Sequence, residues 1–270
     1  GLFETGSFMS EHINPSPLFA RNLGDTAAPP LIILHGLLGT SDNWQSLGKQ
    51  FAETHYVHLL DQRNHGRSPH HASHRYRDMA SDLCAYMDAE NMQSAAILGH
   101  SMGGKTALVF AHENPERVDR LVIADMAARA YTPHHAPIFD ALLTAPIAHA
   151  TSRKEIESHV LARLQEPGMV AFLMKNLRRE KSGGFTWRPN LHVLAESLNE
   201  VVGSVELETN TLPTLLIHGG QSDYVSSADL QLFDQRCLQL ETHKIPEAGH
   251  WLHASHPREF FDVVSDFLNG

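Results

Sequence analysis

The turn at residues 99–104 constrains this chain more than any other segment, because it places a serine between a strand and a helix. It reads Gly-His-Ser-Met-Gly-Gly, with Ser101 at its apex, and follows the apolar residues 95–98. Residues 102–112 continue as a helix-forming segment. This is the G-x-S-x-G pattern of a nucleophile elbow, in which small residues let strand and helix pass closely. The helix N-terminus also favours negative charge that develops near the serine.

The same turn has a second interpretation, as a glycine-rich phosphate-binding loop. Such a loop carries G-K-[ST] at a fixed spacing, or G-x-G-x-x-G after a strand. Neither pattern is present in the sequence. We therefore favour the nucleophile elbow.

The composition is that of a globular protein with one large core. The 270 residues are 42% hydrophobic and 19% charged, and the formal net charge is −10. This charge argues against nucleic acid and anionic membrane surfaces as partners, and no apolar run reaches the roughly 18 residues of a membrane span. The two cysteines, Cys84 and Cys237, are expected to be free thiols, which favours a cytoplasmic location. Residues 1–8 precede Met9 and are interpreted as an expression remnant.

Strands and helices alternate along most of the chain. Strands are predicted at residues 31–34, 56–61, 95–98, 121–123 and 214–218 and near 244–245, and helices at 76–90, 102–112, 227–237 and 256–268. This order predicts an α/β fold with a mostly parallel, doubly wound sheet. Residues 127–209 interrupt it and are predicted to contain only helices and loops. We therefore expect a core of residues 9–126 and 210–270, with residues 127–209 inserted as a helical cap after the strand that ends at Asp125.

A serine hydroxyl becomes a nucleophile only when a base accepts its proton and an acid orients that base. His250 follows the last predicted strand and precedes the final helix, which places its imidazole to serve Ser101 as the base. Two aspartates are placed to support this imidazole, because Asp125 ends one predicted strand and Asp223 follows the next. Each of them could instead cap a turn. We favour Asp125 and keep Asp223 as the alternative acid.

An oxyanion hole needs two backbone N–H groups that point at one position. Met102, the residue after the serine, is expected to supply one of them. The loop after the first buried strand, residues 35–39, reads His-Gly-Leu-Leu-Gly and is expected to supply the other from Leu37. This chemistry requires no metal ion and no cofactor.

Histidine is abundant, with 20 residues, and His65, His70, His71 and His74 lie in one segment. A metal site is one interpretation of this cluster. The spacing fits no H-E-x-x-H helix, however, and no cysteine accompanies the histidines. We therefore expect a solvated polar loop.

Four segments together resemble the α/β-hydrolase superfamily, and within it the YbfF-like esterases. They are residues 35–39 (HGLLG), 61–68 (DQRNHGRS), 99–105 (GHSMGGK) and 248–251 (AGHW). The resemblance implies the α/β-hydrolase fold and a serine esterase or thioesterase that acts on short acyl esters, acyl-CoA among them. It also implies that the acid follows the strand before the cap, which favours Asp125, although other members of the superfamily place it where Asp223 stands.

The cap is expected to determine which acyl groups are accepted. Phe139, Phe172 and Trp187 are predicted to line the substrate pocket with His35, and Arg188 is placed to meet an anionic end of a substrate. Packing within the cap and ordinary surface charge are the alternatives for these residues.

The sequence therefore predicts a serine hydrolase that cleaves esters of short to medium acyl chains, or thioesters, through an acyl-enzyme on Ser101. A C–C hydrolase, lactonase or perhydrolase would use the same residues and is the alternative. A small-ligand receptor with vestigial turnover is a third interpretation. The expected partner is a small-molecule ester or thioester substrate. The sequence leaves the oligomeric state open.

Overall fold

The core of the protein is a seven-stranded sheet, seen in a computed structural model that describes residues 15–270. All neighbouring strands run parallel except the first pair, β1 and β3. The prediction of a mostly parallel sheet is thus confirmed. In spatial order the strands are β1 (Ala20–Leu23), β3 (Tyr56–Leu60), β2 (Pro30–Leu34), β4 (Ala95–His100), β5 (Val118–Ala124), β8 (Asn210–Gly219) and β9 (Cys237–Ile245).

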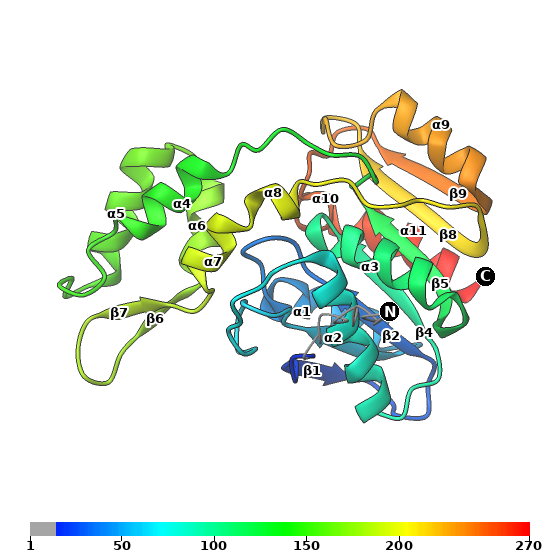
Figure 1. Cartoon of the computed structure of the whole chain (residues 1–270), viewed down its shortest axis with the longest axis horizontal. Helices are drawn as coiled ribbons and strands as arrows, with labels where there is room; N and C mark the ends of the chain where they lie inside the picture. The colour runs from blue at the N-terminus through cyan, green and yellow to red at the C-terminus, as the bar shows by residue number, and fades with distance from the viewer. Residues whose placement is uncertain (1–14) are drawn as a thin grey trace, which may run out of the picture.

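Helices cover both faces of this sheet (Figure 1). Along β2, Ile32 and Leu34 pack in the same cluster as side chains of α2, α3 and α9, whereas Leu31 and Ile33 pack with those of α1, α10 and α11. Each central strand is therefore buried on both faces, which explains its unbroken apolar sequence. The helices of the core are α1 (Gln45–Phe51), α2 (Tyr76–Ala89), α3 (Met102–Glu113), α9 (Ser227–Arg236), α10 (Leu252–Ser255) and α11 (Pro257–Asn269).

Both edges of the sheet differ from the sequence-based expectation. No strand is predicted from the sequence at β1, and only the last two residues of β9 are predicted as a strand. Most residues of β9 are exposed or half-buried, and they include Glu241 and Lys244. Edge strands commonly carry such charged side chains, because charge discourages pairing with another chain, and they therefore lack the apolar run used to recognise a strand.

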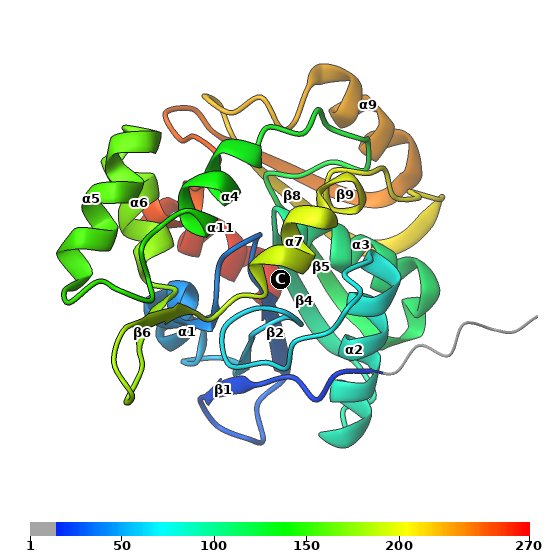
Figure 2. The same ribbon diagram turned by 60° about the vertical axis from the view of Figure 1, so that its left-hand side comes forward.

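Residues between β5 and β8 form a separate, mostly helical layer with its own apolar cluster (Figure 2). It also contains a short antiparallel hairpin, so the expectation of helices and loops alone is wrong. Gly183 and Gly184 form the turn of this hairpin with positive φ angles of 102° and 73°, which suit glycine. The elements of this cap are α4 (Ala136–Leu143), α5 (Arg153–Leu164), α6 (Pro167–Met174), β6 (Leu177–Arg179), β7 (Phe185–Trp187), α7 (Leu191–Glu196) and α8 (Leu198–Val201).

The two linkers that join cap and core run side by side (Figure 1). Tyr131 N–H donates a hydrogen bond of 2.8 Å across them to the carbonyl of Val202. The ammonium group of Lys105, on α3, donates to the carbonyls of Arg129 on one linker and Gly203 on the other, at 2.7 and 2.5 Å. Burial lowers the pKa of Lys105 to about 8. One core side chain therefore holds both linkers.

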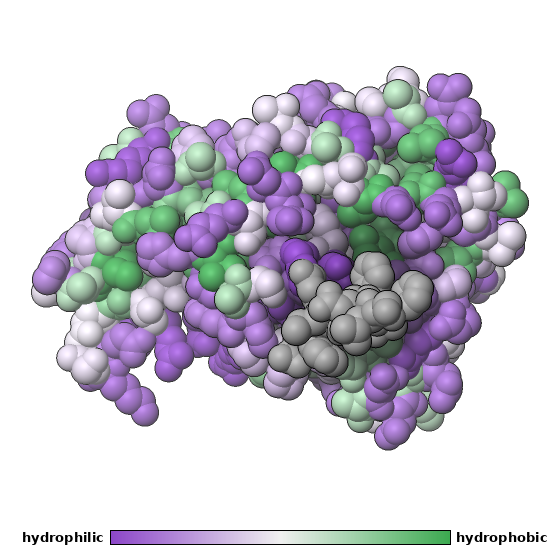
Figure 3. Space-filling view, in the orientation of Figure 1, coloured by the Kyte–Doolittle hydropathy of each residue, from purple (hydrophilic) through white to green (hydrophobic). Residues whose placement is uncertain are grey.

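The surface in Figure 3 is largely hydrophilic, with apolar residues gathered over the cap on the left of the view. Two of the exposed large hydrophobic side chains are Leu143 and Leu161, on α4 and α5. Within residues 15–270, no helix has the length and hydropathy that a membrane-spanning helix requires. The interpretation of residues 1–8 concerns a part of the chain outside this range.

Candidate active site

Ser101 occupies a strained turn between β4 and α3. Its φ and ψ angles are 57° and −121°, a region that residues with a side chain adopt only under strong constraint. The glycines on either side of Ser101 show why the backbone is held in this conformation: strand and helix pass too close for larger residues. A Cβ atom on Gly99 would lie 2.1 Å from the carbonyl oxygen of Gly103, and one on Gly103 would lie 2.2 Å from that of Leu34. The small residues of the G-x-S-x-G pattern are thus required by contacts with the backbone.

The imidazole of His250 links the serine to an aspartate. Ser101 Oγ lies 2.8 Å from His250 Nε2, and His250 Nδ1 lies 2.7 Å from Oδ2 of Asp125. In the tautomer that these contacts favour, Nδ1–H donates to the carboxylate and Nε2 accepts the serine hydroxyl. His250 is 22% exposed and Asp125 is fully buried. Solvent therefore reaches the imidazole but not the carboxylate that orients it.

Asp125 is held by the loop that follows β8. Gly219 N–H donates to its Oδ1 at 3.0 Å, and Ser222 Oγ donates to its Oδ2 at 2.5 Å. These bonds fix the carboxylate opposite the imidazole. Tyr224, from the same loop, stacks on the ring of His250 at 3.8 Å between centroids. Ser222 is not predicted as a site residue from the sequence, although it directly precedes the candidate acid Asp223 in the same loop.

Asp223 does not join this arrangement. Its side chain is exposed, and its recorded contact with the protein is made by the backbone carbonyl, which accepts a hydrogen bond from Arg129. The Nδ1 atom of His250 faces Asp125 instead. Of the two aspartates that the sequence leaves open, only Asp125 is in position to orient the imidazole.

The loop at residues 35–39 approaches the serine closely. A Cβ atom on Gly36 would lie 3.1 Å from Cβ of Ser101. Within residues 15–270, the N–H groups of Leu37 and Met102 have no hydrogen-bond partner in the protein. Two backbone donors are therefore free beside the serine hydroxyl, as an oxyanion hole requires.

Leu38 fixes the conformation of that loop. Its φ angle is 62°, and both of its backbone groups are engaged. Leu38 N–H donates to Nε2 of His65 at 3.0 Å, and Asn176 Nδ2 of the cap donates to the Leu38 carbonyl at 2.8 Å. His65 is in turn fixed as the Nδ1–H tautomer, because that atom donates to the carbonyl of Arg63 at 2.9 Å. The loop is thus hydrogen-bonded to the core through the N–H group of Leu38 and to the cap through its carbonyl group.

The serine opens into a cavity of about 650 Å³ between core and cap. Its apolar walls include Ile138, Met169, Phe172 and Trp251, with the last two rings 4.7 Å apart. Phe172 is a predicted pocket residue that does line this cavity. The volume of the cavity is within the range of small-molecule binding sites, roughly 300–1,000 Å³.

Three of the predicted pocket residues lie elsewhere, and those predictions are wrong. Phe139 is 2% exposed within the cap cluster, while its neighbour Ile138 lines the cavity. Trp187 donates through Nε1 to the carbonyl of Leu142 at 3.0 Å, inside the cap. Arg188 lines a different cleft. The phase of a short helix and the direction of a hairpin decide these positions, and neither can be read from residue type alone.

The buried histidines correct the expectation of a solvated polar loop. His65 and His74 are each 1% exposed, and burial lowers the pKa of His74 to about 3 and that of His65 well below its ordinary value. His35, which lines the cavity as predicted, accepts a hydrogen bond from Gln62 N–H at 2.9 Å, and burial also lowers its pKa. These side chains are neutral structural groups beneath the oxyanion loop.

A family model described as the alpha/beta hydrolase fold matches residues 29–257. This chain belongs to the α/β-hydrolase family. In this α/β hydrolase, Ser101, Asp125 and His250 follow one another along the chain in the Ser…Asp/Glu…His order of that fold. Its resemblance to the YbfF-like esterases is also supported, since it is 32% identical to "Esterase YbfF" of Escherichia coli, over 89% of this chain and 93% of the relative.

Two further relatives are informative. The chain is 35% identical to "sn-1-specific diacylglycerol lipase ABHD11" of Mus musculus, over 95% of this chain and 86% of the relative. Among solved structures, a "Marine microorganism esterase" superimposes with a TM-score of 0.90 at 36% identity, covering 93% of this chain and 99% of that one.

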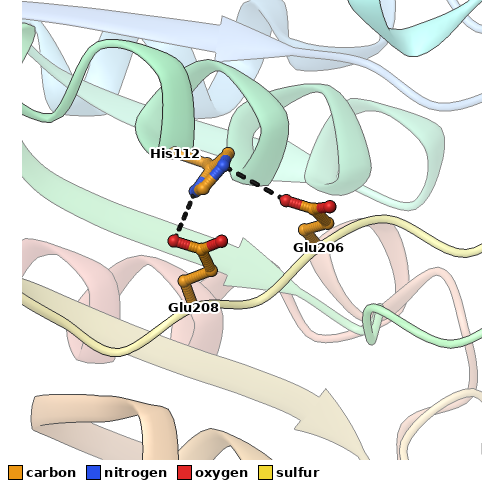
Figure 4. Close-up of side chains that lie close together, drawn as sticks. All are labelled: His112, Glu206 and Glu208. Carbon is orange, nitrogen blue, oxygen red and sulfur yellow. Dashed lines mark ion pairs between the residues drawn. The ribbon is translucent and has the colours of Figure 1, made fainter.

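One surface group in this α/β hydrolase resembles a metal site. His112, Glu206 and Glu208 lie together at the C-terminal end of α3, the end remote from Ser101 (Figure 4). Nε2 of His112 is 3.3 Å from Glu206 and Nδ1 is 3.8 Å from Glu208. The carboxylates face opposite nitrogens of one ring, and all three side chains are exposed. We interpret the group as surface ion pairs.

Proposed function

We propose that the protein is a serine esterase that hydrolyses carboxylic esters of short to medium acyl chains, with thioesters as a related substrate class. The observation that carries this proposal is the continuous contact from Ser101 through His250 to buried Asp125, at 2.8 and 2.7 Å, beside an apolar cavity. The esterase and lipase relatives support the same reaction class.

The proposed reaction proceeds in two stages. Ser101 Oγ attacks the acyl carbonyl while His250 Nε2 takes its proton, and the N–H groups of Leu37 and Met102 stabilise the oxyanion. His250 then returns the proton to the departing alcohol or thiol, which leaves an acyl-enzyme on the serine. Water, deprotonated by His250, attacks the acyl-enzyme, and the proton passes back to Ser101 as the acid leaves. Asp125 orients the imidazole and stabilises its charged form throughout.

A series of p-nitrophenyl esters tests the acyl preference. Because the cavity holds about 650 Å³ and Phe172 and Trp251 are among its apolar walls, we expect kcat/KM to be highest for butyryl to octanoyl esters and to fall for palmitoyl. Ser101→Ala provides the blank, and stoichiometric labelling of Ser101 by a fluorophosphonate verifies the nucleophile. A flat or rising profile up to palmitoyl would contradict the short-to-medium preference. Labelling without turnover of any ester or thioester would contradict the esterase proposal itself.

Asn176→Ala tests whether the cap helps to organise the oxyanion loop. The substitution leaves the buried carbonyl of Leu38 without its donor, so we expect the loop to shift and kcat to fall by about 10-fold with a smaller change in KM. Lys154→Ala, at an exposed position of the cap that does not line the cavity, is the control. An unchanged kcat with only a lower melting temperature would show that Asn176 serves stability alone.

A further inference from the structure

A second cavity lies at the boundary between cap and core. It has a volume of about 720 Å³ and shares no lining residue with the cavity at Ser101. The core contributes the loop after β3, with Arg67 and His70. The cap contributes its hairpin, the lower edge of the cap in Figure 1, with Arg178 and Arg188. Residues from two separate layers of the fold thus form one cleft.

The cleft is strongly basic in a protein whose formal net charge is −10. Three arginines line it, Arg67, Arg178 and Arg188, and no aspartate or glutamate does. Within residues 15–270, none of the three forms an ion pair or a side-chain hydrogen bond, although Arg67 lies over the ring of Phe19 at 5.3 Å. No ion pair with a described residue therefore neutralises their positive charge.

The nearest acids are already engaged elsewhere. Asp42 pairs with Arg21 at 2.7 Å. Asp61 is buried and accepts backbone hydrogen bonds from Ser41 at 2.7 Å and from Arg67 at 3.0 Å. Neither aspartate lines the cleft, so neither is available to pair with the guanidinium groups inside it.

The arginines also act on one another. Partial burial lowers the pKa of Arg188, and the charges of Arg178 and Arg67 lower it further, while Asp42 and Asp61 oppose the shift. Like charges held together in this way are unfavourable unless an anion lies between them. A bound anion would relieve that repulsion.

The walls of the cleft are held in fixed positions. His70 Nε2 donates to the carbonyl of Arg188 at 2.7 Å, which joins core to cap across the cleft. Asn190, two residues after Arg188, donates through its N–H to the carbonyl of Asn64 at 2.8 Å. The backbone that carries Arg188 is therefore joined to the core, so the two walls of the cleft need not be brought together when a ligand binds.

We propose that this cleft binds the phosphate group of a small molecule, either a phosphomonoester or a pyrophosphate. The planar guanidinium group of arginine binds two phosphate oxygens through a pair of hydrogen bonds. Two or three arginines together match the charge of a doubly negative phosphate better than that of a ligand with a single carboxylate. The cavity of about 720 Å³ leaves room for the rest of the molecule. The phosphate can belong to the substrate or to a separate compound, and the two sources are distinguishable by experiment.

Inorganic pyrophosphate is the first probe, titrated into the whole protein by calorimetry at low ionic strength. We expect one saturable site at about millimolar or lower concentration. The double variant Arg178→Gln/Arg188→Gln is expected to weaken binding by about 10-fold or more, since each removes a charged hydrogen-bond donor. Arg179→Gln is the matched control, because Arg179 belongs to the same hairpin, stacks on Phe185 and does not line the cleft.

The outcome decides the proposal. Loss of binding in the double variant with retention in Arg179→Gln supports it. Absence of saturable binding, or equal affinity in the wild type and the double variant, overturns it. This titration requires no hydrolysis, so its failure would leave the esterase proposal standing.

A second measurement identifies the source of the phosphate. Butyryl glycerol and butyryl glycerophosphate are compared as substrates by release of butyrate. A preference for the phosphorylated ester that disappears in the double variant assigns the site to the substrate's own phosphate. Equal rates on the two esters, with pyrophosphate binding intact, assign it to a separate phosphate compound. Either result is consistent with a phosphate site in this cleft.

Discussion

Asp125→Asn is expected to lower kcat for ester hydrolysis by about 10,000-fold, because an amide at this position favours the wrong tautomer of the imidazole. The carboxylate of Asp125 accepts the proton of His250 Nδ1 at 2.7 Å and is itself held by Gly219 and Ser222. An asparagine side chain would fit this space, yet it presents either a neutral oxygen or an N–H group to the ring. Steady-state kinetics on butyryl ester measure the loss directly.

Asp223→Asn is the matched control, since it makes the same chemical change on an exposed side chain of the neighbouring loop. We expect its kcat to stay within about two-fold of the wild type, as for other surface substitutions. Circular dichroism and the melting temperature verify that both variants are folded. Equal losses, or a larger loss in Asp223→Asn, would overturn the assignment of Asp125 as the acid.

Mild acid is expected to unfold the protein in a steep transition. Burial lowers the pKa values of five histidines near the active site. The pKa is about 3 for His74 and His100, lies well below 6.5 for His65 and His253, and is also lowered for His35. Above about pH 6.5 these groups are neutral in both states. Below it the unfolded chain binds protons that the folded protein does not bind.

The direction of the effect follows from this difference. As the pH falls below about 6.5, the free energy of unfolding decreases by up to about 1.4 kcal/mol per pH unit for each such histidine. The contributions of the buried histidines have the same sign, so they add, against a total stability of roughly 5–15 kcal/mol for a typical domain. We therefore expect the melting temperature to fall steeply as the pH drops below about 6.5, which measurements between pH 8 and pH 4.5 would reveal.

His253→Phe isolates one of these groups. The ring of His253 stacks on Trp44 at 4.1 Å between centroids, and its buried Nδ1 has no hydrogen-bond partner among the described residues. Phenylalanine preserves the stacking and cannot bind a proton, so the variant should stay folded to a lower pH and take up about one proton fewer on unfolding. His192→Gln, at an exposed position, is the control. A melting temperature that is constant from pH 8 to pH 4.5 would refute the role of the buried histidines.

The core of the site was predictable because its constraints are local. The elbow at Ser101 needs small neighbours, and the sequence shows them as glycines. The position of His250 follows from the order of strands and helices. The choice between Asp125 and Asp223 was not local, since both follow neighbouring parallel strands and only the path of the loop after β8 decides which carboxylate meets the imidazole.

The cap was less predictable for the same physical reason. Phe139 and Ile138 are adjacent on α4, and which of them faces the cavity depends on how that helix packs against α5 and α7. Arg188 was predicted to meet an anion in the substrate pocket. The hairpin directs it instead into the separate basic cleft, where its charge is available for a different binding event.

The contacts of Lys105 bear on how the cap can be exchanged. Since one ammonium group binds the carbonyls of both Arg129 and Gly203, the core alone sets the spacing at which the inserted segment leaves and returns. Insertions are tolerated best where their two ends lie close together. The residues between these anchors therefore form a unit that evolution or a protein engineer can replace to change substrate choice, while Ser101, Asp125 and His250 remain in the core and a new cap needs only to replace the Asn176 contact with the loop at Leu38.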